Sequence, residues 1–305
     1  MPAMTRLPIN LPAAGRYLLA VSGGADSMVL LHALAEAARG RGYHLWVGHV
    51  DHGLRPDSAV DRQLVQQVAA ALALPFSYYE ARLPAGASEA AARQARHTWL
   101  QAEAGRHKAT VVTAHHQDDL LETSLLNLAR GSGRRGLVPM QSGHVVRPLL
   151  NATRAQIRAY AAERRLIWHD DPTNADLANP RNLLRHRMLP AAPAGWREQY
   201  LANLREFATL NPSIDAKLAE LIGQPGPQGF TWPIGLVRGL ELDELAEFLA
   251  AAARRLDPRA ELTRRGLDEL ALFAKTAAGG RRPLTQSLWL SRERTYLRLA
   301  IIPVR

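Results

Sequence analysis

The sequence predicts an α/β fold, with a doubly wound parallel sheet followed by a smaller C-terminal α+β domain. Up to about residue 150, short apolar segments alternate with segments of helical periodicity, which is typical of buried parallel strands joined by helices. A glycine-rich turn follows the first apolar segment, and folds of this class bind ligands at the carboxyl ends of their strands. Beyond residue 223 the pattern changes to helices and a closing hairpin.

The individual elements follow from the periodicity in chain order. Strands are expected at five short apolar segments: 17–21, 44–50, 76–81, 110–114 and 145–149. Helices are expected where apolar residues recur at helical spacing: 27–38, 58–72, 88–104, 118–129, 154–164, 198–221, 242–255 and 263–275. A basic helix is expected to end at Pro190, and alternation in "SLWLSRERTYLRLAII" predicts a hairpin. The glycine- and proline-rich segment "GQPGPQG" interrupts the helical pattern. We therefore divide the chain into a domain of residues 1–195, a helical connector of residues 196–222 and a domain of residues 223–305.

Composition narrows the class of partner. The 305 residues include 38 Lys and Arg but only 28 Asp and Glu, a net charge of +10. Such a surplus favours a polyanion such as nucleic acid, although a solvated basic surface is the alternative. The absence of cysteine excludes disulfides, thiolate zinc sites and iron–sulfur clusters in this chain. With no signal peptide and no apolar run of 18 residues, we expect a cytoplasmic protein without a membrane span.

The turn after the first strand, "SGGADS" at 22–27, has the composition of a phosphate-binding loop. Gly23 and Gly24 would let backbone N–H groups approach an anion, and the following helix N-terminus adds partial positive charge. Ser22 and Ser27 could donate hydroxyl hydrogen bonds. Asp26 would repel phosphate unless a cation lay between them, which predicts Mg²⁺ at Asp26. The spacing matches neither a Walker loop nor a dinucleotide fingerprint, and the alternative is a tight turn with a capping aspartate.

Acidic residues follow the fourth strand in "TAHHQDDLLETSLLNLARGSGRRGL". His115, Asp119 and Glu122 stand at i, i+4 and i+7 and therefore share a helix face. Carboxylates there could bind a metal, hold a cationic substrate, or act as a general base on an amine, whose pKa of about 10.4 in lysine keeps it protonated. The alternative is a solvated acidic helix face.

Three basic segments accompany these motifs. The segment "ARGSGRRG" is glycine-rich and has the composition of a loop that closes on phosphate or RNA. Two further pairs of arginines have helical spacing, and each could be ordinary surface charge. The residues concerned are Arg130, Arg134 and Arg135, then Arg93 and Arg96, then Arg181 and Arg185.

Eight motifs follow one another over about residues 16–190: "SGGADS", "VDHGLR", "EAAARQAR", "AHHQDDLLET", "GSGRRGL", "RPLL", "DDPTN" and "RNLLRH". The first resembles the loop of the N-type ATP pyrophosphatases, and the ordered set resembles the tRNA(Ile)-lysidine synthetase family. The resemblance implies that ATP and Mg²⁺ are used to ligate L-lysine to C2 of the wobble cytidine of tRNA(Ile) with a CAU anticodon. An adenylated cytidine would be the intermediate, and AMP and pyrophosphate the products.

The resemblance also implies roles for particular residues. It assigns ATP phosphate and Mg²⁺ binding to Ser22, Gly23, Gly24, Asp26 and Ser27, and catalysis and lysine handling to Arg96, Asp119, Glu122 and Arg185. We add Ala25 and His52, from the loop and the end of the second strand, to the ATP-binding residues, and Asp26 to the catalytic ones. From the basic segments we expect tRNA contacts at Arg130, Arg134, Arg135 and Arg181. Residues 1–195 would be the catalytic domain and 223–305 a tRNA-binding domain, and a homodimer is left open. Thr173 stands where serine is usual in the family, and "ANP" precedes Arg181 where an aromatic residue is common.

Three other functions compete with this interpretation. A tRNA 2-thiolation enzyme would share the adenylation but normally needs cysteines, which this chain lacks. An amidating ligase such as NAD synthetase would share the loop but leaves the basic surplus without a partner. A nucleotide-regulated RNA-binding module without chemistry would gain nothing from Asp26, Asp119 and Glu122 beside a bound anion.

Overall fold

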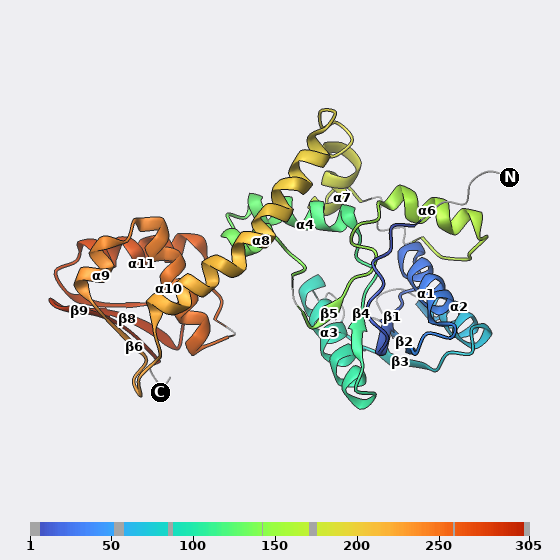
Figure 1. Cartoon of the computed structure of the whole chain (residues 1–305), viewed down its shortest axis with the longest axis horizontal. Coiled ribbons are helices and arrows are strands. Elements are labelled where there is room, and N and C mark those ends of the chain that lie inside the picture. The colour runs from blue at the N-terminus through green and yellow to red at the C-terminus, as the bar shows by residue number, and fades with distance from the viewer. Residues whose placement is uncertain are drawn as a thin grey trace. The chain divides into compact units, whose positions relative to one another are not determined.

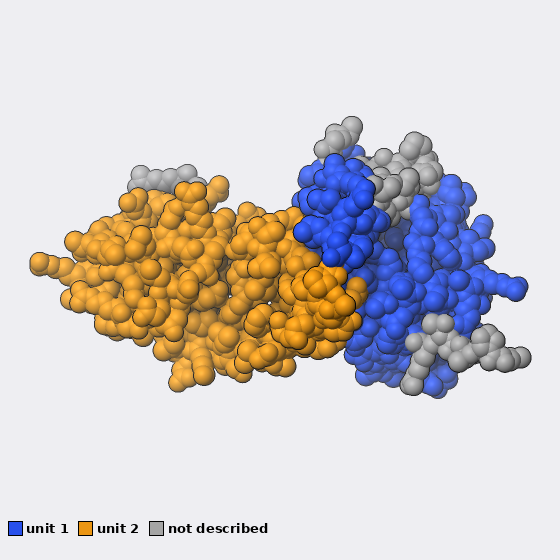
Figure 2. All heavy atoms as spheres, turned by 90° about the horizontal axis from the view of Figure 1, so that it is seen from above, with its two compact units in different colours: residues 1–123, 140–191 blue, residues 124–139, 192–305 orange. Residues whose placement is uncertain are grey.

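The computed structural model describes residues 7–51, 58–84, 88–141, 143–170, 176–258 and 260–301. The chain divides into two compact units, each made of two segments of the chain (Figure 2). Unit 1 comprises residues 1–123 and 140–191, and unit 2 comprises residues 124–139 and 192–305. None of the helices in these described ranges is both long and apolar enough to cross a membrane.

Unit 1 is built on the predicted parallel sheet. Its five strands run in the order β3-β2-β1-β4-β5, with every neighbouring pair parallel. Their bounds are β1 Arg16–Ala20, β2 His44–Asp51, β3 Phe76–Glu80, β4 Thr110–Val112 and β5 Val145–Val146. The last strand is shorter than predicted, because Pro148 has no N–H group to extend a ladder of hydrogen bonds. The expected doubly wound parallel sheet is confirmed.

Helices cover both faces of this sheet (Figure 1). On one face lie α1 (Ala25–Ala38), α2 (Ser58–Ala71) and α6 (Arg154–Glu163), and on the other lies α3 (Glu89–Arg106). Alternation along β1 explains the two cores, since Leu19 packs in the cluster that contains Met28 of α1 whereas Leu18 packs with Leu100 of α3. Full burial of each such side chain is worth about 1.5–3 kcal/mol.

Two further elements carry the acidic and basic motifs of unit 1. Helix α4 (Gln117–Ala129) follows β4. The predicted basic helix is a short α7 (Pro180–Leu183) continued by a π-helical turn, η2 (Leu184–Met188). Asn179 caps α7 by accepting a hydrogen bond from the Arg181 N–H at 2.9 Å, and proline occupies the first helical position.

Unit 2 contains an antiparallel sheet in the order β6-β9-β8-β7. The predicted hairpin is formed by β8 (Leu288–Arg292) and β9 (Tyr296–Ile301). The flanking strands β6 (Phe230–Pro233) and β7 (Gly280–Pro283) were not expected, since each has only four residues and ends in proline. Helices α9 (Ile234–Gly239), α10 (Leu242–Leu256) and α11 (Arg264–Thr276) share its core, and α5 (Arg134–Leu137) and α8 (Trp196–Ile222) complete the unit.

Candidate active site

The candidate site lies in unit 1 at the carboxyl ends of β1 and β4. These two strands are neighbours, but β2 and β3 extend the sheet on one side of β1 and β5 extends it beyond β4. The strand order therefore reverses between β1 and β4, and such a switch point leaves a crevice between the loops that follow the two strands. The loop after β1 is "SGGADS", and the segment after β4 leads into the acidic helix α4.

The two serines of the first loop close it on itself. The hydroxyl of Ser27 donates to the carbonyl of Gly24 at 2.8 Å and accepts the backbone N–H of Ser22 at 3.1 Å. The hydroxyl of Ser22 lies 3.2 Å from that of Ser27 and accepts the Gly24 N–H at 3.4 Å. These contacts give the loop a fixed shape before any ligand binds.

Gly23 is required by its conformation and by its surroundings. Its φ of +96° belongs to a region that residues with a side chain rarely adopt. A Cβ at this position would lie 3.2 Å from the Cβ of Asp61 on α2. Its carbonyl accepts the backbone N–H of His169 at 3.1 Å, and the His169 ring contacts Asp61 at 2.8 Å. The loop is thus held from outside by α2 and by the segment after α6.

The first turn of α1 is left open for an anion. Gly24 is the N-cap and has no side chain to accept the first N–H groups of the helix. Those groups, together with the helix dipole, make this end of α1 attractive to phosphate.

A cavity of about 460 Å³ lies over this helix end. Backbone and small side chains of the sheet form part of its wall, and the polar groups come from the loop, α3, the segment between β4 and α4, α4 itself and the segment after β5. The polar lining residues are Ser22, Asp26, Ser27, Arg93, Arg96, His97, Gln101, Thr113, His115, Asp119 and Arg147. The N-terminal end of α1, three arginines and two carboxylates therefore face one space.

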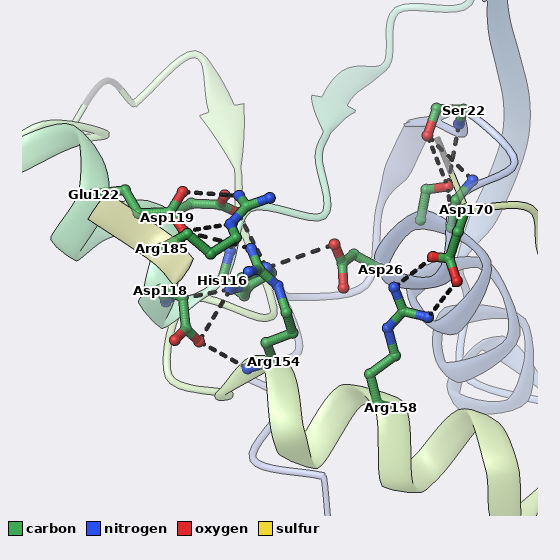
Figure 3. A network of polar contacts seen from close by, with 12 residues as sticks. Ser22, Asp26, His116, Asp118, Asp119, Glu122, Arg154, Arg158, Asp170 and Arg185 are labelled. Atoms are coloured by element: carbon green, nitrogen blue, oxygen red, sulfur yellow. Dashed lines mark hydrogen bonds and ion pairs between the residues drawn. The ribbon is translucent and has the colours of Figure 1, made fainter. Parts of the chain in front are cut away.

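His116 joins the carboxylates of the loop and of α4 (Figure 3). It is completely buried, and its Nε2 lies 3.5 Å from Oδ2 of Asp26 and 3.4 Å from Oδ2 of Asp119. Its Nδ1 lies 3.5 Å from Oδ2 of Asp118, which also accepts the backbone N–H of Arg154 at 2.7 Å. The His116 ring therefore connects the loop after β1 with α4, and it lies between carboxylates that would otherwise repel one another.

The protonation of this cluster follows from its charges. Burial acts to lower the pKa of His116, but the three carboxylates outweigh it and raise that pKa from 6.5 to about 9. The N–H of Asp118, 3.2 Å from Nδ1, favours the neutral ring, but one amide dipole is weaker than three charges. Burial likewise acts to raise the pKa of Asp26, and the charges of His116 and Arg154 hold it below its usual value. At neutral pH the cluster is an imidazolium among carboxylates.

The neighbouring His115 is in the opposite state. Burial lowers its pKa to about 4; Asp119 opposes the shift, and the nearby arginines, Arg147 first among them, reinforce it. Its Nδ1 lies 2.7 Å from the hydroxyl of Thr113. A neutral imidazole therefore lines the cavity beside a charged one that is buried behind it.

Glu122 is buried among arginines. Both of its oxygens accept hydrogen bonds from Arg185, at 2.7 Å from Nε and 2.9 Å from Nη2. Nε of Arg181 lies 3.1 Å away and a guanidinium nitrogen of Arg154 lies 3.6 Å away. The same Arg185 reaches within 4.0 Å of Asp119. Glu122 thus fixes guanidinium groups beside the carboxylate that lines the cavity.

The residues at the loop fit a magnesium ion that is shared with phosphate. Oδ1 of Asp26 is buried and has no hydrogen-bond partner among the described residues. Within the same ranges, no group of three or more His, Asp or Glu side chains is arranged to hold a metal by itself. Mg²⁺ is commonly held by one or two carboxylates together with substrate phosphates and water, which needs no such group.

The structure brings most of the predicted catalytic residues together. Asp26, Arg96 and Asp119 line the cavity, and Arg185 connects Glu122 to Asp119. His52, predicted to bind ATP, and Thr173 lie outside the described residues.

The four arginines predicted to contact tRNA lie in different settings. Arg181 belongs to unit 1, where its Nε forms an ion pair with Glu122 and its Nη2 donates to the Thr123 hydroxyl. The other three belong to unit 2, where Arg130 is exposed and Arg134 and Arg135 both pair with Asp215.

Sequence reasoning missed three residues of the site. His116 was given no role, although two adjacent histidines followed after one residue by two aspartates are a visible signal. Arg147, within the motif "RPLL", was given no role, and it lines the cavity. Arg154 lies at the start of α6, and only the folded chain brings it to Glu122 and Asp118.

Comparisons with known proteins agree with this geometry. The family model of the PP-loop domain matches residues 4–192. A tRNA(Ile)-lysidine synthase of Alkalilimnicola ehrlichii is 38% identical over 260 residues, 80% of this chain and 55% of that protein. One of Solibacter usitatus is 33% identical over 303 residues, 95% of this chain and 68% of that protein. The chain thus spans between about half and two thirds of the length of these relatives.

Among solved structures, a U34-tRNA thiolase of Methanococcus maripaludis, with its [4Fe-4S] cluster, has a similar fold. The TM-score is 0.55 at 12% identity, and the match covers 67% of this chain and 77% of that one. At this identity the likeness speaks for the fold alone.

Proposed function

Since the chain belongs to the tRNA(Ile)-lysidine synthase family of PP-loop proteins, we propose that it ligates L-lysine to C2 of the wobble cytidine of tRNA(Ile) with a CAU anticodon. ATP would be cleaved to AMP and pyrophosphate in the process. One observation supports this most: the phosphate-type loop and an acidic helix face one cavity, and Asp26 and Asp119 both lie within 3.5 Å of Nε2 of His116.

The first step would be adenylation of the cytidine. O2 of cytosine attacks the α-phosphorus of ATP, the bond to the bridging oxygen breaks, and pyrophosphate leaves. The N–H groups at the start of α1 and the guanidinium groups of Arg93, Arg96 and Arg147 face the space where that negative charge develops. Donors fixed in advance stabilise such a transition state most. Mg²⁺, held at Asp26, would supply further positive charge to the phosphates when bound.

The second step would be attack by lysine. Its ε-amine forms a bond to C2, the C2–O2 bond breaks, and AMP leaves with that oxygen. The amine must first lose a proton. Asp119 is the better placed acceptor, because it lines the cavity, whereas both oxygens of Glu122 already receive guanidinium N–H groups. We therefore assign proton removal to Asp119 and positioning of Arg185 to Glu122.

The RNA imposes a demand of its own. The wobble cytidine must leave the stacked anticodon loop to enter the cavity. The remainder of the tRNA therefore needs a second binding surface. We assign that binding surface to residues 223–305, in keeping with the excess of basic residues in the chain. A sulfur-transfer reaction is not favoured, since the chain has no cysteine.

The experiment is a measurement of AMP release by the full chain. Reactions contain ATP and Mg²⁺ with a tRNA(Ile) transcript bearing CAU, and lysine is added or omitted; a matched transcript carries guanosine at the wobble position. We expect sustained AMP release only with lysine and the cytidine-bearing transcript, together with lysine covalently bound to RNA. AMP release that is indifferent to lysine, or that requires ammonia instead, would contradict the proposed function.

A further inference from the structure

The antiparallel sheet of unit 2 has one covered face and one open face. Helices α9, α10 and α11 lie along one side of the sheet (Figure 1). Leu288, Leu290, Leu297 and Leu299 are fully buried in the core that these helices share. The residues between them in the strands point to the opposite face and are partly exposed. We call this the outer face, and it consists of Thr231, Pro233, Arg281, Pro283, Trp289, Ser291, Tyr296, Arg298 and Ala300.

Strand register places arginines beside aromatic rings on the outer face. Arg281 and Arg298 each lie opposite Ser291, one on either side of it. The guanidinium of Arg281 lies 4.8 Å from the centre of the Trp289 ring, and that of Arg298 lies 5.2 Å from the Tyr296 ring. Each pair combines a flat π surface with a positive charge.

The two arginines differ from others in the same unit. Arg134, Arg264 and Arg265 form ion pairs with acidic side chains. For Arg281 and Arg298 no carboxylate partner is found in the described parts of unit 2. The strand register adds one acidic residue at the end of this face, Glu293, whose N–H donates to the carbonyl of Tyr296. The charge of the two arginines is therefore available to an anionic partner, at a surface where flat apolar rings are also within reach of solvent.

We propose that the outer face binds unpaired nucleotides of RNA, with bases stacked on Trp289 and Tyr296 and phosphates against Arg281 and Arg298. Base faces are accessible to aromatic side chains only where bases are unpaired, so the surface should prefer single strands to duplex. Tyr296 belongs to β9 and lies one residue pair beyond the pair of Arg292 and Leu297, so it faces position 293. Measured along the strand direction, the Tyr296 ring is therefore four residues from the Trp289 ring. That is about 13 Å, so they would hold two different bases.

This inference extends the proposed function, because it rests on the chain acting on RNA and names how unit 2 would hold it. It concerns only residues of β6 to β9 and none of the cavity in unit 1. The two ideas can therefore fail separately.

The test is equilibrium binding of the full chain to two labelled RNAs, an unpaired 12-nucleotide oligouridylate and a blunt hairpin, at one fixed salt concentration. The variants are Trp289→Ala, Trp289→Phe and Arg281→Ala. Arg265→Ala is the matched control, since it removes the same charge from α11, which packs on the covered face. Thermal melting of each variant checks that unit 2 is folded.

We expect Trp289→Ala and Arg281→Ala to weaken oligouridylate binding about tenfold and hairpin binding less than about twofold. Trp289→Phe, which keeps a ring, should restore most of the affinity, and Arg265→Ala should change both RNAs by the same small factor. Unchanged oligouridylate binding by folded Trp289→Ala would overturn the proposal. Equal losses on both RNAs, or an equal loss in Arg265→Ala, would also overturn it, because charge alone would then explain binding.

The same preparation is assayed for lysine-dependent AMP release. If the wild-type chain forms lysidine and Trp289→Ala binds oligouridylate as tightly as the wild type, the proposal for the outer face is refuted and the proposed function stands. A chain with the expected oligouridylate selectivity but without AMP release would support the outer face and refute the proposed function.

Discussion

Replacement of Glu122 by glutamine tests the buried ion cluster of unit 1. The Glu122 side chain is 0% exposed and contacts three guanidinium groups, those of Arg154, Arg181 and Arg185. Glutamine keeps the shape, but it removes the negative charge and turns one oxygen acceptor into an N–H donor that faces an arginine. The variant therefore leaves buried positive charge without compensation.

The magnitude follows from the exposure of the partners. Removing one member of a buried ion pair costs about 3–5 kcal/mol. The guanidinium groups are not fully buried, since their side chains are 16%, 32% and 26% exposed for Arg185, Arg181 and Arg154, so water compensates part of the loss. We expect a destabilisation of about 3 kcal/mol, which for a unit of this size lowers Tm by about 6–12 °C.

Differential scanning calorimetry measures this shift. Glu269→Gln is the matched control, because Glu269 is 66% exposed and pairs only with exposed Arg265 in the described structure, so its loss should cost no more than about 0.5 kcal/mol. In activity assays, Glu122→Gln should leave ATP binding nearly intact and slow lysine incorporation, since Glu122 positions Arg185 beside Asp119. A variant that melts with the wild type would show that this cluster does not hold the site.

Three other predictions concern the loop and the acidic helix. Gly23→Ala should weaken ATP binding and destabilise unit 1 by about 1–2 kcal/mol, because φ of Gly23 is +96° and a Cβ would contact Asp61. Gly24→Ala is the control and should leave Tm almost unchanged, since Gly24 has an ordinary φ. Equal changes of Tm in the two variants would contradict the argument. Asp119→Asn should slow lysine incorporation by about 10²–10⁴-fold in single-turnover assays while adenylated tRNA accumulates, whereas a rate within threefold of the wild type would remove it as the base. The raised pKa of His116 stabilises the folded protein below its unfolded value of 6.5, and that stabilisation, at most about 3 kcal/mol, should be lost as pH rises through about 9. Urea unfolding at pH 6, 8 and 10 measures the loss, which should be absent from His116→Asn.

The fold was predictable because each layer of unit 1 leaves a periodic signal. Strands buried on both faces form continuous apolar segments, and amphipathic helices repeat every three to four residues. The two short strands of unit 2 lack this signal, since four residues ending in proline can be recognised as strands only through their neighbours. Trp232, for example, is buried against Phe248 of α10, which the sequence of β6 cannot reveal.

The site was predictable where its residues are contiguous and hidden where they are not. The loop at 22–27 and the helix after β4 are local motifs, and their chemistry follows from composition. The partners of Glu122 depend on tertiary structure, because Arg154, Arg181 and Arg185 come from two distant segments. Arg134 shows the converse: its glycine-rich surroundings suggested a loop arginine facing RNA, but its side chain donates to Asn211 and Glu247 within unit 2.

The central claim is that the loop after β1 binds the phosphates of ATP and that Asp119 binds the side-chain amine of lysine. Its most direct test is a crystal structure of the chain with a non-hydrolysable ATP analogue, Mg²⁺ and lysine. We predict phosphate oxygens on the N–H groups of residues 23–27, the ion at Asp26, and the lysine ammonium beside Asp119. Phosphates bound away from this loop, or lysine bound away from Asp119, would contradict the account.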